Sequence, residues 1–246
     1  MKETKDFDLV AFAPHPDDLE LACGGTLAKL AKLGHRVAMV DLTGGEMGSR
    51  GTVEIRQEEA ARAAAVLGVA HRENLALTDC DLQDSKENRI KVVTALRRLR
   101  PRFVLLPYPV TRHPDHYYAS RLVEHACFFS GVKKYPGEGE SFRPACLLFY
   151  MGWPEFSPSF IVDVSEYFDQ KMEAARCFSS QFYDPRSSEK ETLISSPDFF
   201  EALEVRARYY GNKIGVRYGE PFFIRQFPGI DDPVSFFTLN KNFISK

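Results

Sequence analysis

A regular alternation of short β-rich runs and longer helical patterns constrains the fold of this chain most. Apolar runs at 9–13, 36–43, 73–77 and 103–106 predict strands, and apolar residues at helical spacing fill much of the intervening sequence. Such alternation is typical of βαβ units and of a mostly parallel sheet with helices on both faces. We therefore expect an α/β, Rossmann-like fold.

Capping residues and breakers set the predicted helix bounds in this half. A first helix ends at Gly34, and Thr52 is the expected N-cap of a second helix that ends at Gly68. A third helix begins near Asn88 and stops before Pro101. These bounds place each helix between two predicted strands.

The second half of the chain is less regular. We expect a helix over about 115–129, strands near 146–151 and 160–164, and a helix capped by Ser165 that runs to about residue 178. A last helix starts at Ser196-Pro197-Asp198 and ends at Gly211. Because no change in composition marks a boundary, residues 1–246 are predicted to form one domain with an α+β C-terminal elaboration.

Charge and cysteine usage exclude several classes of protein. The 246 residues contain 32 Lys and Arg against 34 Asp and Glu, so no overall basic field favours nucleic acid or anionic lipid as a partner. The five cysteines are widely spaced and form no C-x-x-C pair, which is typical of reduced thiols. No apolar run is long enough to span a bilayer. We expect a soluble cytoplasmic protein.

Two clusters of polar residues each follow a predicted strand. His15-Pro16-Asp17-Asp18 follows the first strand, and His113-Pro114-Asp115-His116 follows the fourth. The carboxyl ends of parallel strands form the crevice where ligands bind, so the two clusters are predicted to share one site. Two imidazoles and one carboxylate would hold a zinc ion and leave one position open for water, as catalytic zinc sites require.

The remaining polar residues of the clusters suit amide hydrolysis. Of the adjacent pair Asp17 and Asp18, one would bind the metal and the other would act as a base on the activated water. His113 would be the cation that faces the tetrahedral oxyanion, kept charged and oriented by Asp115. The clusters therefore predict a metal-dependent hydrolase.

Two other loops are not assigned a cofactor-binding or metal-binding role. The glycine-rich loop at 44–51 lacks the G-x-G-x-x-G pattern and follows the second strand, so we interpret it as a wall of the pocket and not as a phosphate-binding loop. Asp79-Cys80-Asp81 could supply a second metal site, but we interpret it as a polar loop.

The two clusters resemble those of the LmbE-like (PIG-L) family of zinc-dependent N-acetylglucosamine deacetylases. The similarity extends through residues 37–60 and a later run at 215–222, and it covers essentially the whole chain. By this resemblance Asp17 is the general base, His113 stabilises the oxyanion and is oriented by Asp115, and Arg56 contacts the substrate. The zinc ligands that it implies are His15, Asp18 and His116. Arg112, beside the second cluster, is a further candidate for substrate binding.

The combination of motifs most resembles the branch that deacetylates N-acetylglucosaminyl malate in bacillithiol synthesis. Two arginines would suit the two carboxylates of malate, which a guanidinium binds bidentately. Another N-acetylglucosamine derivative, such as a chitin oligosaccharide, is the alternative substrate. The metal could be zinc, Fe²⁺ or another divalent ion, and the family suggests a homo-oligomer. Two other classes stay open: a non-haem iron enzyme, since two histidines and a carboxylate also form its facial triad, and a catalytically silent binding module.

Overall fold

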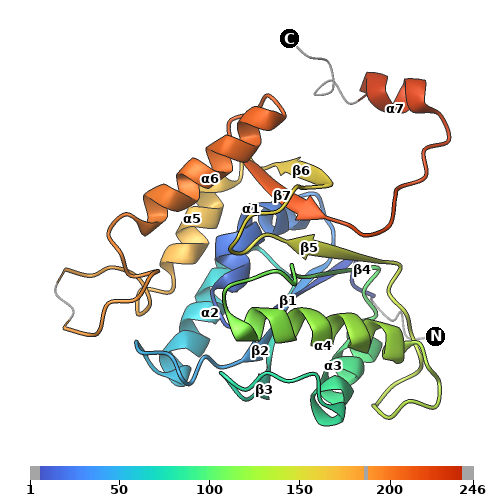
Figure 1. Ribbon diagram of the computed structural model, residues 1–246, viewed down its shortest axis with the longest axis horizontal. Coiled ribbons are helices and arrows are strands. Elements are labelled where there is room, and N and C mark those ends of the chain that lie inside the picture. The colour runs from blue at the N-terminus through green and yellow to red at the C-terminus, as the bar shows by residue number, and fades with distance from the viewer. Residues whose placement is uncertain (1–5, 186–187, 240–246) are drawn as a thin grey trace.

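A seven-stranded sheet forms the centre of the computed structural model, which describes residues 6–185 and 188–239 (Figure 1). Within these residues the strand order is β3-β2-β1-β4-β5-β7-β6. Strands β1 to β5 pair in parallel, whereas β7 runs antiparallel to both β5 and β6. The strands are β1 (Leu9–Ala13), β2 (Val37–Thr43), β3 (His71–Leu77), β4 (Phe103–Pro107), β5 (Cys146–Tyr150), β6 (Phe160–Asp163) and β7 (Gly219–Phe223). This mostly parallel sheet confirms the predicted α/β class.

Helices cover both faces of the sheet. One face packs against α3 and α4, and the other against α1, α2, α5 and α6. The helices are α1 (Asp18–Lys32), α2 (Val53–Leu67), α3 (Lys86–Leu99), α4 (Pro114–Ser130), α5 (Phe168–Arg176), α6 (Phe199–Lys213) and α7 (Pro233–Leu239). None of these helices combines the length and the apolar character needed to cross a bilayer.

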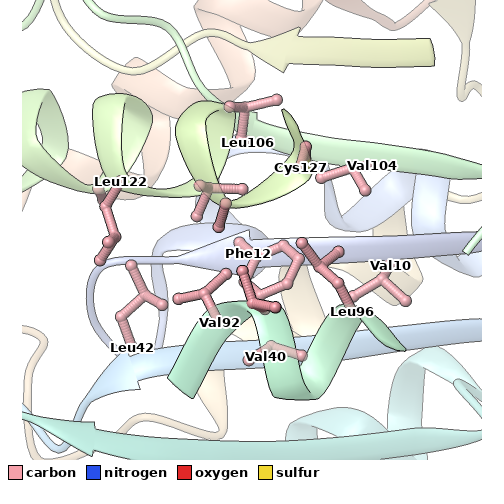
Figure 2. Packing of buried hydrophobic residues seen from close by; sticks show 14 of the residues in the cluster. Val10, Phe12, Val40, Leu42, Val92, Leu96, Val104, Leu106, Leu122 and Cys127 are labelled. Carbon is pink, nitrogen blue, oxygen red and sulfur yellow. The ribbon is translucent and has the colours of Figure 1, made fainter. Parts of the chain in front are cut away.

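Strand β1 is apolar throughout because both of its faces are buried. Val10 and Phe12 point into the cluster formed with α3 and α4, where Leu96 and Leu122 meet them (Figure 2). The alternate residues, such as Ala11, belong to the cluster on the opposite face. Full burial of a side chain such as Phe12 contributes about 1.5–3 kcal/mol. The central strand, and with it the loop that follows, is therefore firmly placed.

Helix α2 begins and ends as the sequence predicts. The Thr52 hydroxyl accepts a hydrogen bond from the backbone N–H of Ile55 at 3.3 Å. Gly68 ends the helix in the left-handed region, with φ of 71°. The start of the fifth helix differs from the prediction, because Tyr167 and not Ser165 precedes α5. The Ser165 hydroxyl instead donates to Asp163 and accepts from the N–H of Tyr218, which ties β6 to the segment before β7.

Helix α1 is broken at Cys23, where φ is −143°. The sequence indicates one continuous helix here. The break exposes N–H groups at the start of the second half, and the Glu220 carboxylate accepts from Gly25 at 3.0 Å and from Thr26 at 2.7 Å. The ammonium of Lys171 lies 2.6 Å from the same carboxylate. Strand β7, which was not predicted, thus supplies the cap, and the first turn of α1 is separate from the rest of the helix.

Candidate active site

The two polar clusters lie together at one edge of the sheet. Strands β1 and β4 are adjacent and parallel, so the loops that follow them emerge side by side. The ring centroids of His15 and His113 are 5.1 Å apart, those of His15 and His116 are 5.6 Å apart, and those of His113 and His116 are 5.3 Å apart. Segments about a hundred positions apart in the chain therefore converge, as the sequence predicts.

Asp18 lies between the two histidines that were predicted to bind metal with it. Its carboxylate oxygens are 3.3 Å from Nδ1 of His15 and 3.3 Å from Nε2 of His116. One potential ligand atom from each of the three residues lies within 4.8 Å of the others. Imidazole nitrogen and carboxylate oxygen are the donors that catalytic zinc sites use, so the donor set fits a zinc ion.

Burial and neighbouring charges shift the pKa values of these three groups in different directions. Burial alone would raise the pKa of Asp18, but the neighbouring His116 and His15 outweigh burial and lower it. Burial lowers the pKa of His116. Asp18 is therefore a carboxylate and His116 a neutral imidazole near neutral pH, and a divalent cation binds those forms. At His15, hydrogen bonds to carboxylates outweigh burial and raise the pKa, so a cation that binds there displaces a proton.

The second ring nitrogen of His15 contacts two carboxylates. Its Nε2 lies 3.0 Å from Asp79 Oδ1 and 3.2 Å from Asp115 Oδ2. A histidine that binds metal through one nitrogen usually donates its other N–H to such a partner, which fixes the ring and its tautomer. These two carboxylates therefore hold Nδ1 of His15 toward Asp18.

Asp79 was missed as a site residue by the interpretation of 79–81 as a polar loop. The residue is 5% exposed, accepts a hydrogen bond from the N–H of Met47, and contacts His15. The position of Asp79 in the sequence could have identified it as a site residue. Asp79 comes just after β3, and the carboxyl end of β3 lies at the same edge of the sheet as those of β1 and β4.

Asp115 orients His113 in a different way from the one expected. The Asp115 carboxylate contacts His15, and it is the backbone N–H of Asp115 that donates to Nδ1 of His113, at 3.2 Å. Because Nδ1 is an acceptor, the ring proton resides on Nε2. Burial also lowers the pKa of His113. Asp115 thus orients His113 through its backbone N–H and leaves Nε2 of His113 able to donate, and the role of His113 at the oxyanion stays a prediction.

Asp17 lies beside the predicted metal ligands, but its side chain pairs with an arginine. Its side chain turns to Arg56, whose Nη2 is 3.1 Å from Oδ2, and its backbone has φ of 114°, a conformation rare outside glycine. Burial raises the pKa of Asp17 to about 7, against the opposing effect of Arg56. A pKa near the working pH suits a general base.

Arg56 is held by three protein groups. Besides Asp17, its guanidinium donates to the carbonyl oxygens of Pro16 and Gly45. Gly45 has φ of 68°, and a Cβ added there would lie 2.0 Å from Nη1 of Arg56, so only glycine allows this close approach. The structure thus places Arg56 behind Asp17, and its contact with substrate stays a prediction.

The clusters form part of the wall of a cavity of about 350 Å³. Its other walls include Met47 from the glycine-rich loop, Trp153 from the loop after β5, and Leu193. Arg112 also lines the cavity, is exposed, and forms no ion pair with residues 6–185 or 188–239. The volume is within the range of about 300–1,000 Å³ that is usual for small-molecule sites.

Comparison with known proteins identifies relatives of this chain. A family model described as PIG-L, GlcNAc-PI de-N-acetylase, matches residues 10–127. The diacetylchitobiose deacetylase of Thermococcus kodakarensis is 32% identical over 90% of this chain and 84% of its own length. A probable N-acetyl-α-D-glucosaminyl L-malate deacetylase of Bacillus anthracis is 28% identical over 71% of this chain and 80% of its own.

A solved structure agrees with these matches. The crystal structure of a conserved protein from Thermus thermophilus superimposes with a TM-score of 0.83 and 45% identity, over 92% of this chain and 98% of that protein. The similarity therefore extends well beyond the two polar clusters. Together the matches show that this chain belongs to the PIG-L (LmbE-like) family of metal-dependent N-acetylglucosamine-type deacetylases.

Proposed function

We propose that this protein uses zinc to hydrolyse the acetamido group of an N-acetylglucosamine residue in a small conjugate. The observation that carries the proposal is the cluster of His15, Asp18 and His116 beside the buried Asp17, in the wall of one cavity. Three ligands for a metal and a separate carboxylate base are the groups that amide hydrolysis by an activated water needs.

The side chains around the cluster have complementary roles in this reaction. When bound, a zinc ion would lower the pKa of a water molecule and polarise the acetyl carbonyl. Asp17 accepts the proton of the attacking water and returns it to the departing amine, so that the C–N bond breaks as acetate forms. Nε2–H of His113 donates to the developing oxyanion. Arg56 holds the Asp17 carboxylate in place throughout.

A disaccharide of N-acetylglucosamine is our first candidate substrate. It is supported by the identity and coverage of the Thermococcus relative, whose name specifies diacetylchitobiose. The exposed apolar side chains that line the cavity, such as Met47 and Trp153, would suit a sugar ring.

N-acetylglucosaminyl malate, the substrate that the sequence resemblance implies, is the second candidate. Arg112 favours it, because this exposed guanidinium lines the cavity without an ion-pair partner in the described parts of the chain. Arginine binds carboxylates bidentately, and malate would present two of them. The Bacillus relative supports the same substrate.

Acetate release from purified protein tests the proposal. The metal-free protein would be loaded with Zn²⁺ or Fe²⁺ and incubated with di-N-acetylchitobiose, N-acetylglucosaminyl malate and free N-acetylglucosamine. We expect acetate and free amine in equal amounts, with the disaccharide fastest. No acetate from any substrate with either metal would contradict a deacetylase, and equal rates on all three would contradict the preference for a conjugate.

We also propose that the protein acts in the cytoplasm and as a homo-oligomer. All five cysteines are unpaired, which suits a reducing compartment. The assembly rests on the family resemblance alone. Light scattering of the purified protein would measure its mass, and a mass of one chain across the micromolar range would contradict an oligomer.

A further inference from the structure

Trp153 is the only tryptophan in the sequence, and it lines the cavity that holds the polar clusters. It follows β5 and is 47% exposed, although a large aromatic residue contributes most when buried. The side chains of His15, Asp18 and His116 are only 12%, 15% and 16% exposed. Trp153 is thus at the mouth of the cavity and the reacting groups are at its floor.

The indole ring is restrained on one face by Arg206, which also lines the cavity. The guanidinium of Arg206 lies over one face of the ring, 5.7 Å from the centroid. Arg206 is itself fixed, because it donates to the carbonyl oxygens of Gly152 and Leu21. With Arg206 against one face, a ligand that packs on the ring would contact the other face.

The backbone of Trp153 is tied to the catalytic edge of the sheet. Its carbonyl oxygen accepts a hydrogen bond of 3.0 Å from the N–H of Arg112, one residue before His113. The preceding Gly152 lies next to His116, and a Cβ built on this glycine would be 3.9 Å from Nδ1. The ring therefore has a fixed position relative to the proposed metal ligands, and little conformational freedom is lost when a ligand packs on it.

An exposed aromatic side chain that is restrained on one side suits one chemical class of ligand. The face of an aromatic ring is apolar and carries partial negative charge, so it packs well against the C–H groups on the flat side of a pyranose. Met47 and Leu193, on two other loops, are 66% and 53% exposed and also line the cavity. Apolar side chains from three loops thus surround the mouth of a polar site.

We propose that Trp153 is the stacking platform for a second pyranose ring, the one attached to C1 of the N-acetylglucosamine that is deacetylated. The inference rests on the proposed function, which places the acetyl group at the floor of the cavity and the rest of the conjugate toward its mouth. It makes the substrate an oligosaccharide, because malate has no ring to stack.

Fluorescence of the metal-free protein tests the contact without any need for catalysis. All tryptophan emission comes from Trp153, since the chain has no other. We expect di-N-acetylchitobiose to change the emission in a saturable way, with an affinity about tenfold higher than that of N-acetylglucosamine. A saturable change in emission from a protein that deacetylates none of the substrates would contradict the proposed function but would still support stacking on Trp153. If emission stays unchanged at disaccharide concentrations at which the metal-loaded enzyme is active, the stacking role of Trp153 is overturned.

Kinetics of variants give a second readout. We expect Trp153→Ala to raise KM for the disaccharide about tenfold more than KM for N-acetylglucosamine, and Trp153→Phe to restore most of the difference. Phe128→Ala, which removes an aromatic residue that is 59% exposed on α4 outside the cavity, is the matched control. Equal effects of Trp153→Ala on both substrates, or a higher affinity of the metal-free protein for N-acetylglucosaminyl malate than for the disaccharide, would contradict the inference.

Discussion

Nη2 of Arg56 lies 3.1 Å from Oδ2 of Asp17, and the two side chains are only 6% and 7% exposed. Removing one partner leaves the other charge buried without compensation, which typically costs about 3–5 kcal/mol. We expect Arg56→Met to lower the free energy of unfolding by about that amount. Urea denaturation of the metal-free protein measures it.

A double mutant and a matched variant sharpen this test. Arg56→Met combined with Asp17→Asn should lose less stability than the sum of the two single changes, because each single change leaves one buried partner alone. Arg62→Met removes an exposed arginine from the same helix and should change stability by less than about 0.5 kcal/mol. Additive losses in the double mutant would refute a coupled pair.

Gly45→Ala should disturb the same pair without changing either partner. The new methyl group would lie 2.0 Å from Nη1 of Arg56 and would require φ near 68° at an alanine. Arg56 must then move away from Asp17, so we expect turnover to fall about tenfold or more, as small displacements in an active site do. Gly34→Ala has a similarly positive φ but no atoms within 4 Å of the added Cβ, and it serves as the control. Equal losses in the two variants would show that backbone strain alone is responsible.

Asp17→Asn separates proton transfer from metal binding. The amide keeps the size of the carboxylate but cannot accept the proton of water, so turnover should fall about 10²–10⁴-fold. Metal content, measured by atomic emission, should match that of the unchanged protein. Wild-type turnover in this variant would remove Asp17 from the mechanism, and loss of metal would reassign it as a ligand.

Zinc should stabilise the folded chain through His15, Asp18 and His116. A ligand at about 100 times its dissociation constant adds about 2.7 kcal/mol to the free energy of unfolding. We expect this gain in urea denaturation with zinc, its loss on addition of a chelator, and its absence in His116→Ala. His125→Ala is the control, because His125 pairs with Asp84 outside the cluster. A full zinc effect in His116→Ala would contradict the proposed ligand set.

Most strands in the parallel half of the sheet could be predicted from the sequence. Strands β1, β2 and β4 are nearly continuous apolar runs, and helix α2 carries both its capping signals, Thr52 and Gly68. The convergence of His15 and His116 also followed from the pattern, since the carboxyl ends of adjacent parallel strands share one edge.

Features that depend on tertiary contacts were not predictable in the same way. Strand β7 has Pro221 at its centre, and it forms beside β5 and β6 at the antiparallel side of the sheet. The break in α1 at Cys23 depends on a carboxylate from that strand. The partner of the Asp115 carboxylate, His15, depends on how two loops meet, and local spacing contains no information about that choice.

Glu220→Gln should weaken the contacts that stabilise α1 after its break at Cys23. The carboxylate caps Gly25 and Thr26 and pairs with Lys171, and the side chains of the ion pair are almost completely buried. Neutralising it leaves the ammonium without its counter-charge, so we expect a loss of about 3–5 kcal/mol in the free energy of unfolding. The exposed Glu201→Gln is the control. Equal stability of the two variants in urea would show that the pair contributes nothing.

The cap on α1 also has a consequence for the order of assembly. Gly25 and the residue that caps it are 195 positions apart, so the helix that begins at Asp18 is completed by a segment that leaves the ribosome much later. Contacts of such long sequence separation form slowly, because a large loop must close first. A nascent chain that has not yet reached β7 already contains every proposed zinc ligand, yet it lacks the carboxylate that caps the part of α1 beyond Cys23.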